Sequence, residues 1–338
     1  MNDNNFILVP SAQMEKRFAS ILCTKGFTAE RAEKCAAIFT ENSVDGIYTH
    51  GVGRFSRFVQ SIQDGFVHPM LSPTFTNGFG GLEQWNGNLG PGPLNALHAT
   101  DRVMELAKQH GIGCVALSNT NHWMRGGTYG WKAAKAGFVF IGWTNTIGIM
   151  PAWGAIDSKL GNNPLVFALP FKEEAIVLDM AMSQYSYGAM ELAVLKNEKL
   201  AVKGGYDLSG EQTNDPAAIL ATKRPLPIGY WKGAGLSLLL DILATILSAG
   251  LSTHEISKKK VENGLSQVYI AIDLLQLGNH SLISNAVEGI ITDYHQSVSE
   301  DDSKIITYPG ERVLQHRKIN LANGVPVLQK VWDKIMQL

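Results

Sequence analysis

Apolar residues along this chain recur at two different spacings, which predict two kinds of secondary structure. Spacings of three and four residues are typical of helices with one buried face, and short apolar runs are typical of buried strands. After residue 54 the helical spacing continues as far as Gly65, where a C-terminal cap is expected. Further helices are predicted over 11–25, 28–45, 94–110, 129–136, 190–200, 233–247, 281–295 and 325–338. Strands are predicted over 112–117, 138–143, 165–169, 175–180 and 268–275, and polar loops over 204–216 and ahead of the last helix.

Helices alternate with strands through the middle of the chain, and this order predicts a layered α/β core. The first helices and the last one are expected to pack together as a smaller module, because chain termini often lie close to one another. We therefore predict that residues 1–75 and 310–338 form a helical module and that residues 76–309 form the α/β domain.

Composition narrows the classes of protein that need to be considered. The 338 residues, 45% of them hydrophobic, suit one large or two modest globular domains. The net charge of −1 provides no basic surface for nucleic acid or for an anionic membrane. The three cysteines are an odd number without zinc-site spacing, so we expect no metal, no disulfide framework and a reducing cytoplasm.

The sequence predicts neither a signal peptide nor a membrane-spanning helix. Residues 1–5 lack the basic and apolar regions of a signal peptide. The most apolar long run, 235–250, is short for a bilayer span and has Asp241 in its middle. We therefore predict that this run is a buried helix.

Residues 49–54 place a histidine and an arginine around two glycines at the start of a predicted helix. Glycines let the backbone approach a ligand, and a helix N-terminus presents free N–H groups to an anion. Arg54 adds a donor fork that matches a carboxylate, and His50 is suited to proton transfer near neutral pH. These residues predict a small anionic substrate beside a proton donor. A glycine turn with a capping histidine and a surface arginine fits them as well.

Several predicted loops lie at strand ends, where open α/β sheets bind ligands. Residues 121–127 combine polar, aromatic and basic side chains after the strand at 112–117, although a hydrogen-bonded loop that packs Trp123 would look similar. The Asn and Thr side chains at 143–146 and 161–164 suit ligand recognition, but turn formation is a commoner role for Asn.

Cofactor chemistry is indicated only indirectly. Three G-x-G sequences occur, but none continues to the third glycine of the dinucleotide fingerprint, so a dinucleotide site would not be of the Rossmann kind. Lys232, framed by glycines at a helix start, suits a phosphate or a plain helix cap. Asp179 closes an apolar strand and is either a helix cap or a ribose ligand.

Several segments together resemble the type-2 malate/L-lactate dehydrogenase family, in matching order from about residue 10 to the end. They are Tyr48–Phe55, Asn121–Gly127, Trp143–Asn145, Asn163–Leu165, Asp179–Met180 and Gly229–Gly233. The resemblance implies a mixed sheet with a non-Rossmann NAD-binding fold, and a homodimer in which the helical module serves the substrate and the dimer contact. Within the family, residues 121–127, 183–188 and 309–310 look most like one member, a sugar-acid reductase.

The resemblance also implies roles for individual residues. His50 corresponds to the proton donor, and Arg54, His122 and Thr49 to residues of the substrate pocket. The residues implied for the cofactor are Ala175, Ile176, Val177, Leu178, Asp179, Met180, Ala181, Trp231, Lys232, Gly310, Glu311 and Arg312. Thr49 stands where the family usually has serine, and its methyl group is expected to tighten the pocket. The run 310–312 is not identical to that of the close relative, which weakens its assignment.

The activity implied is NADH-dependent reduction of a 2-oxo sugar acid, with NADPH as a second possible cofactor. The cofactor would supply the hydride and His50 the proton. Two alternatives stay open from the sequence. One is another substrate of the same family, such as a simpler 2-oxo acid, an imine or ureidoglycolate, and the other is a sugar-acid-binding protein without turnover.

Overall fold

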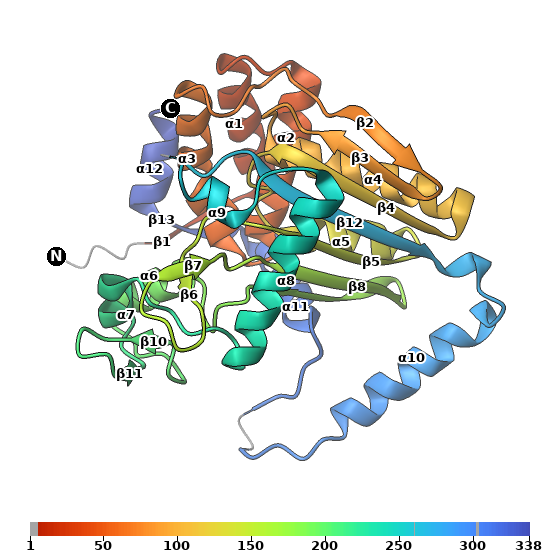
Figure 1. Ribbon diagram of the computed structural model, residues 1–338. Coiled ribbons are helices and arrows are strands. Elements are labelled where there is room, and N and C mark those ends of the chain that lie inside the picture. Colours follow the sequence, from red (N-terminus) through yellow and green to blue (C-terminus); the bar gives the residue numbers. More distant parts are fainter. Residues whose placement is uncertain (1–5, 260, 302–303) are drawn as a thin grey trace.

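The computed structural model describes residues 6–259, 261–301 and 304–338 of the chain (Figure 1). The prediction made from residues 1–5, that they form no signal peptide, lies outside these residues. The helices are α1 (Ser11–Thr24), α2 (Ala29–Val44), α3 (Val52–Gln63), α4 (Gly92–His110), α5 (Gly126–Lys135), α6 (Tyr187–Lys196), α7 (Pro216–Thr222), α8 (Trp231–Ser248), α9 (Thr253–Ile256), α10 (His280–His295), α11 (Glu311–Asn323) and α12 (Gln329–Met336), with short 3-10 turns η1 (Tyr48–His50) and η2 (Leu274–Gln276). The strands are β1 (Phe6–Val9), β2 (Thr74–Phe79), β3 (Leu82–Asn86), β4 (Ile112–Thr120), β5 (Phe138–Thr144), β6 (Met150–Pro151), β7 (Ser158–Leu160), β8 (Leu165–Phe171), β9 (Glu174–Met180), β10 (Gly205–Tyr206), β11 (Gln212–Thr213), β12 (Leu265–Asp273) and β13 (Val325–Leu328).

The central element is a seven-stranded mixed sheet in the order β2-β3-β4-β12-β5-β8-β9. Strands β3 and β4 run parallel, and the other neighbouring pairs run antiparallel. Helices α4 and α5 cover one face, where Val115 and Tyr269 join a buried core, and α8 covers the other, where Ala116 and Val268 do so (Figure 1). Successive residues of a strand point to opposite faces, which explains this alternation. The predicted α/β core with a mixed sheet is confirmed.

The two ends of the chain meet beside this sheet. Strand β1 pairs antiparallel with β13, from Phe6 opposite Leu328 to Val9 opposite Val325. Helices α1, α2, α3 and α12 enclose a separate apolar core in which the Phe18 and Phe55 rings stack with their centroids 3.9 Å apart. The packing is consistent with a terminal module, whose boundaries at 1–75 and 310–338 stay a prediction.

The last part of the chain differs from its prediction. The predicted helix over 325–338 begins instead with β13, whose Val325 and Val327 are buried against β1. The polar loop expected ahead of it contains α11, in which Asn320 is the buried residue. Its Leu314 packs against the core of the sheet, whereas Ile319 and Leu321 are exposed. The apolar residues of this helix therefore do not form one face, so the sequence pattern missed it.

Helix α8 corrects the prediction of a buried helix too short to span a bilayer. Ala244 is buried against the sheet, but Leu239 is 56% and Ile246 62% exposed on the opposite face. Among the described residues, α8 is apolar enough over its 18 residues to cross a membrane by length and composition alone, which is weak evidence because packed helices pass the same test. The Asp241 carboxylate accepts hydrogen bonds from the Asn145 side chain and the Thr253 N–H, which ties the helix to the body of the protein. The sequence, which is apolar all around the helix, therefore did not reveal that one face is left uncovered by the described residues.

Helix α10 extends away from the rest of the molecule (Figure 1). None of its residues is buried, and Leu282, Ile290 and Tyr294 are exposed. One ion pair, between Lys172 and Glu288 at 2.9 Å, links it to the turn between β8 and β9. Helices α8 and α10 thus both present apolar side chains to the exterior.

Candidate active site

The end of α2 fixes the turn that carries His50. The Ser43 hydroxyl accepts a hydrogen bond from the Val52 N–H at 2.8 Å, and the Asn42 side chain donates one to the His50 carbonyl at 3.0 Å. A side chain at Gly51 would begin 2.2 Å from the Ser43 oxygen, so glycine is required there. Helix α3 begins directly afterwards, as predicted, and His50 is held beside its N-terminus.

The structure brings His50 and His122 together from distant parts of the chain. Their rings stack with centroids 5.8 Å apart and an interplanar angle of 18°. The Thr49 hydroxyl lies 3.1 Å from His50 Nδ1, and His122 Nδ1 accepts from the Met124 N–H at 3.0 Å. The accepted bond places the proton of neutral His122 on Nε2. In each ring Nε2 has no hydrogen-bond partner among the described residues, so this nitrogen is available to a ligand.

The loop that carries His122 has both of the roles that its sequence suggested. The Asn121 side chain donates to the carbonyls of Phe66, Leu89 and Gly90, and Trp123 is fully buried. The same loop turns the His122 ring toward His50. A hydrogen-bonded, well-packed loop and a ligand-facing histidine are therefore parts of one arrangement.

The Thr49 side chain packs against the first turn of α6. The ideal Cβ position at Gly188, in the first turn of α6, is 2.9 Å from the Thr49 methyl carbon. The methyl group that distinguishes threonine from serine therefore faces Gly188. A larger residue at either position would push α6 away from the histidine pair.

Both histidines are hard to protonate in this environment. Burial, together with the positive charges of Arg54 and Arg125, lowers the pKa of His50 to about 4. Burial also lowers the pKa of His122 well below its ordinary value, with Arg54 and His50 contributing. Both rings are therefore neutral at pH 7 when no anion is present.

A small open cavity of about 70 Å³ adjoins His122. Its lining residues are Arg54, Arg57, Phe58, Ser61, Phe66, Val67, Asn121, His122, Met124, Val261 and Glu262. The Arg54 guanidinium is half-buried and has no hydrogen bond or ion pair with any described residue. Arginine is seldom buried without a partner, so the cavity is suited to an anion.

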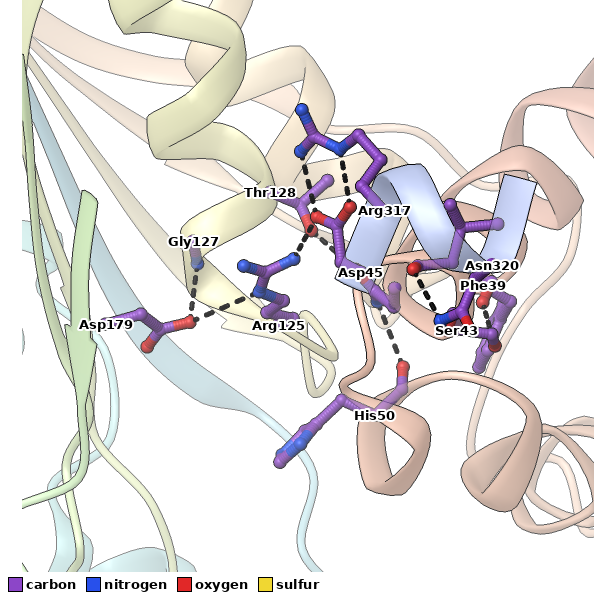
Figure 2. A network of polar contacts seen from close by, with 12 residues as sticks. Phe39, Ser43, Asp45, His50, Arg125, Gly127, Thr128, Asp179, Arg317 and Asn320 are labelled. Atoms are coloured by element: carbon purple, nitrogen blue, oxygen red, sulfur yellow. Dashed lines mark hydrogen bonds and ion pairs between the residues drawn. The ribbon is translucent and has the colours of Figure 1, made fainter. Parts of the chain in front are cut away.

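A buried ion-pair network lies behind the histidines (Figure 2). The Asp45 carboxylate accepts from Arg125 at 2.5 Å and from Arg317 at 2.7 Å and 3.0 Å. Arg125 also lies 3.9 Å from Asp179, which accepts from the Gly127 N–H at 2.7 Å. The network joins the end of α2 to α5, α11 and β9, and so fixes the position of the His50 turn relative to the sheet.

Sequence reasoning missed Asp45 and Arg317 in this network. They are 272 residues apart, and neither belongs to a recognisable motif. Asp179 was predicted to be a helix cap or a ribose ligand, and its carboxylate does bind the N-terminus of α5. A contact between Asp179 and a ribose remains a prediction.

The three segments predicted for the cofactor lie around strand β9. Val177 donates to the Pro309 carbonyl at 3.0 Å, so the 175–181 and 310–312 segments touch. Ile228 donates to the Met182 carbonyl at 2.8 Å, which brings the start of α8 to the far end of the same strand. Since β9 is an edge strand, its outer backbone groups are open to further hydrogen bonds.

The residues here suit a polar ligand with an aromatic part. The Ser183 side chain is 4% exposed, and its hydroxyl has no hydrogen-bond partner among the described residues. Trp231 is 64% exposed, with the Lys232 ammonium 6.0 Å from its ring centroid. An unpartnered buried hydroxyl, an exposed indole and a nearby cation fit a nucleotide's hydroxyls, ring and phosphate. A plain surface charge at Lys232 fits the same geometry.

The other polar loops have structural roles. The Asn145 side chain binds Asp241, the Leu251 carbonyl and the Ser266 N–H, and the Asn163 side chain binds Ser237. Both asparagines are fully buried. These side chains thus join segments that lie far apart in the chain, which is a structural role different from local turn formation. Ligand recognition by the two loops stays a prediction.

Known proteins resemble the chain over nearly its whole length. A sequence model of the malate/L-lactate dehydrogenase family matches residues 9–336. The 2,3-diketo-L-gulonate reductase of Citrobacter koseri is 40% identical over 327 residues, with 96% of this chain and 98% of that protein covered. The enzyme of that name from Klebsiella pneumoniae is 40% identical over 331 residues, covering 98% and 99%. The solved malate dehydrogenase of Entamoeba histolytica has the same fold, with a TM-score of 0.93 at 21% identity and coverage of 98% and 97%.

The fold is a mixed sheet flanked by helices, unlike the parallel sheet of the Rossmann class, and of the stacked histidine pair His122 lines the arginine-rich cavity. Together with the relatives, these features define an α/β oxidoreductase. The chain belongs to the malate/L-lactate dehydrogenase family, as its motifs indicated. The member that residues 121–127, 183–188 and 309–310 resembled is 2,3-diketo-L-gulonate reductase. The similarity to that enzyme is confirmed by the relatives from two organisms.

Proposed function

We propose that the protein reduces the C2 carbonyl of a 2-oxo sugar acid with NADH, converting 2,3-diketo-L-gulonate to 3-dehydro-L-gulonate. The observation that carries the proposal is the unpaired Arg54 guanidinium beside two stacked histidines whose Nε2 atoms are free. The names of the relatives that are 40% identical support the choice of substrate.

Arg54 binds the substrate carboxylate through its planar donor fork. His122, whose Nε2 carries the proton, donates to the substrate carbonyl or a neighbouring hydroxyl and orients it. The Thr49 hydroxyl holds His50 Nδ1, so His50 Nε2 faces the substrate oxygen and delivers the proton to the developing alkoxide. General acid help of this kind contributes about 10²–10⁴-fold to the rate.

Substrate binding resolves the low pKa of His50. Without an anion, burial first and then the charges of Arg54 and Arg125 disfavour protonation of His50, and its pKa is about 4. A bound carboxylate offsets the charge of Arg54, and this raises the pKa of His50 toward neutrality. His50 therefore takes up its proton from solvent when the anionic substrate binds, and it is ready as an acid only in the complex.

NADH, when bound, supplies the hydride. We assign its binding to backbone groups of residues 175–181, to Trp231 and Lys232, and to residues 310–312, with NADPH as the alternative cofactor. The buried, unpartnered Ser183 hydroxyl and the exposed Trp231 ring support this assignment. We also place the enzyme in the cytoplasm, in keeping with its three unpaired cysteines.

We further propose a homodimer. The exposed leucine and isoleucine side chains of α8 and the projecting helix α10 support this, because large apolar surfaces of this kind are usually covered in an assembly. Sedimentation equilibrium tests the stoichiometry: a dimer is expected, and a monomer at micromolar concentration would contradict the proposal.

Substrate-dependent NADH oxidation, followed by absorbance, tests the proposed function. A panel of 2,3-diketo-L-gulonate, pyruvate, a cyclic imine acid and ureidoglycolate, each with NADH and NADPH, separates this activity from others of the family. The highest kcat/KM is expected for 2,3-diketo-L-gulonate with NADH. A different preferred substrate would move the function within the family, and no oxidation with any compound would favour a binding protein.

A further inference from the structure

The cavity extends beyond Arg54 to a second pair of charged groups, Arg57 and Glu262. We propose that these two residues bind the distal hydroxyl groups of the substrate and thereby select polyhydroxylated acids over short 2-oxo acids. This inference rests on the proposed function and adds to it the residues that set substrate preference.

Geometry places Arg57 at the same site as Arg54. The two residues lie three positions apart on α3, so their side chains share one face of the helix, and both line the cavity. Burial is the main cause that lowers the pKa of Arg54 and of His122, and the charge of Arg57 adds to it in both cases, as expected of a nearby cation. The charge of Glu262 acts on Arg54 in the opposite direction, so the two arginines and this carboxylate lie close enough to influence one another.

Neither side chain has all of its hydrogen-bonding groups paired among the described residues. The exposed Arg57 guanidinium has no hydrogen bond or ion pair with the residues that the structure describes. Glu262 accepts the Ile147 N–H at 3.1 Å through one carboxylate oxygen, and its second oxygen has no partner in the described part of the chain. The cavity therefore offers a strong donor and a strong acceptor beyond the carboxylate site at Arg54.

A hydroxyl group is the ligand chemistry that matches this pair, because it donates and accepts at once. A second carboxylate would gain from Arg57 but would be repelled by Glu262. A methyl group, as in pyruvate, would leave both charged groups without a partner on the ligand, so that only water could bind them. The pair consequently favours a mono-acid with hydroxyl groups at its far end over a dicarboxylate or a short 2-oxo acid.

Two conservative variants test this assignment. Glu262→Gln keeps an oxygen that can accept from Ile147, and Arg57→Gln keeps a donor while it removes the charge. The measurement is the ratio of kcat/KM for 2,3-diketo-L-gulonate to kcat/KM for pyruvate. Loss of a hydrogen bond to a charged group should lower this ratio about 10- to 100-fold in each variant. Gln63→Ala, an exposed position on α3 outside the cavity lining, serves as the control and should leave the ratio unchanged.

A ratio that stays at the wild-type value in both variants would overturn the inference, and so would equal losses for the two substrates. A binding measurement distinguishes a failure of this inference from a failure of the proposed function. The dissociation constants of L-gulonate and L-lactate, measured by calorimetry without cofactor, should diverge in the same direction, with L-gulonate selectively weakened in both variants. If no 2-oxo acid is reduced but this selective weakening is found, the proposed reaction is wrong and the hydroxyl subsite stands. If the two ligands weaken equally, the subsite is wrong whatever the reaction.

Discussion

The two ends of the candidate site are built in different ways. At the substrate end, the His50 turn, the His122 loop and the Asp45 network are held by side-chain hydrogen bonds between buried or partly buried groups. At the proposed cofactor end, Trp231, Lys232 and Arg312 are exposed, and the segments touch mainly through backbone hydrogen bonds. Catalytic geometry tolerates little displacement, whereas a large cofactor brings many contacts of its own. The difference indicates that the substrate end is preorganised and that the cofactor end is completed on binding.

Removing the proton donor should give the largest loss of activity, and it should affect the substrate end of the site without affecting the cofactor end. We expect His50→Asn to lower kcat by about 10²–10⁴-fold while the dissociation constant of NADH stays near that of wild type. Steady-state kinetics measures the change in kcat, and an NADH fluorescence titration measures the dissociation constant. Near-normal turnover in the variant would transfer the role to His122.

The rigidity of the substrate end depends on Asp45, which faces two arginines. Asp45→Ala leaves the buried Arg125 without its partner, and we expect the free energy of unfolding to fall by about 3–5 kcal/mol. Urea denaturation measures this. Glu30→Ala, which breaks an exposed ion pair on α2, is the matched control and should change nothing measurable. Equal behaviour of the two variants would mean that the network does not hold the site together.

Arg54→Lys keeps the charge at the substrate end but removes the donor fork. The KM for 2-oxo acids should rise about tenfold, with a smaller change in kcat, because a bidentate contact becomes a single one. Initial rates over a range of substrate concentrations check this. An unchanged KM would show that another group, with Arg57 the nearest candidate, holds the carboxylate.

The smallest effect is expected at the cofactor end. Lys232→Ala should raise the dissociation constant of NADH about two- to fivefold, as expected for one exposed charge near a phosphate. The comparison variant is Lys330→Ala, an exposed lysine on α12. If the two variants bind NADH equally well, Lys232 is only a surface charge.

The sequence predicted strands β4, β5, β8, β9 and β12 and most of the long helices because their apolar spacing is regular. It missed β2 and β3, because β2 is exposed along its whole length and neither strand forms a buried apolar run. It also failed for α11, whose apolar residues do not form one face, and for the outer face of α8, where side chains that look buried by pattern are exposed among the described residues. The resemblance to a known family pointed to His50 and His122, which the fold then brings together. Nothing local in the sequence could identify Asp45 and Arg317, because an ion pair between distant residues depends on the folded chain. The sequence could not identify the pair of Arg57 and Glu262 for the same reason.

The central claim is that the substrate anion, once bound at Arg54, allows His50 to hold the proton it donates. A general acid must be protonated, so the rate of reduction falls as pH rises through its pKa. The parameter kcat/KM reports the free enzyme, and kcat reports the complex. The pH dependence of both, measured for 2,3-diketo-L-gulonate reduction with saturating NADH, is therefore the most direct test. We predict that kcat/KM declines as pH rises above about 4, the pKa of His50 in the empty site, and that kcat holds to a distinctly higher pH. Coincident midpoints for the two parameters would contradict the account.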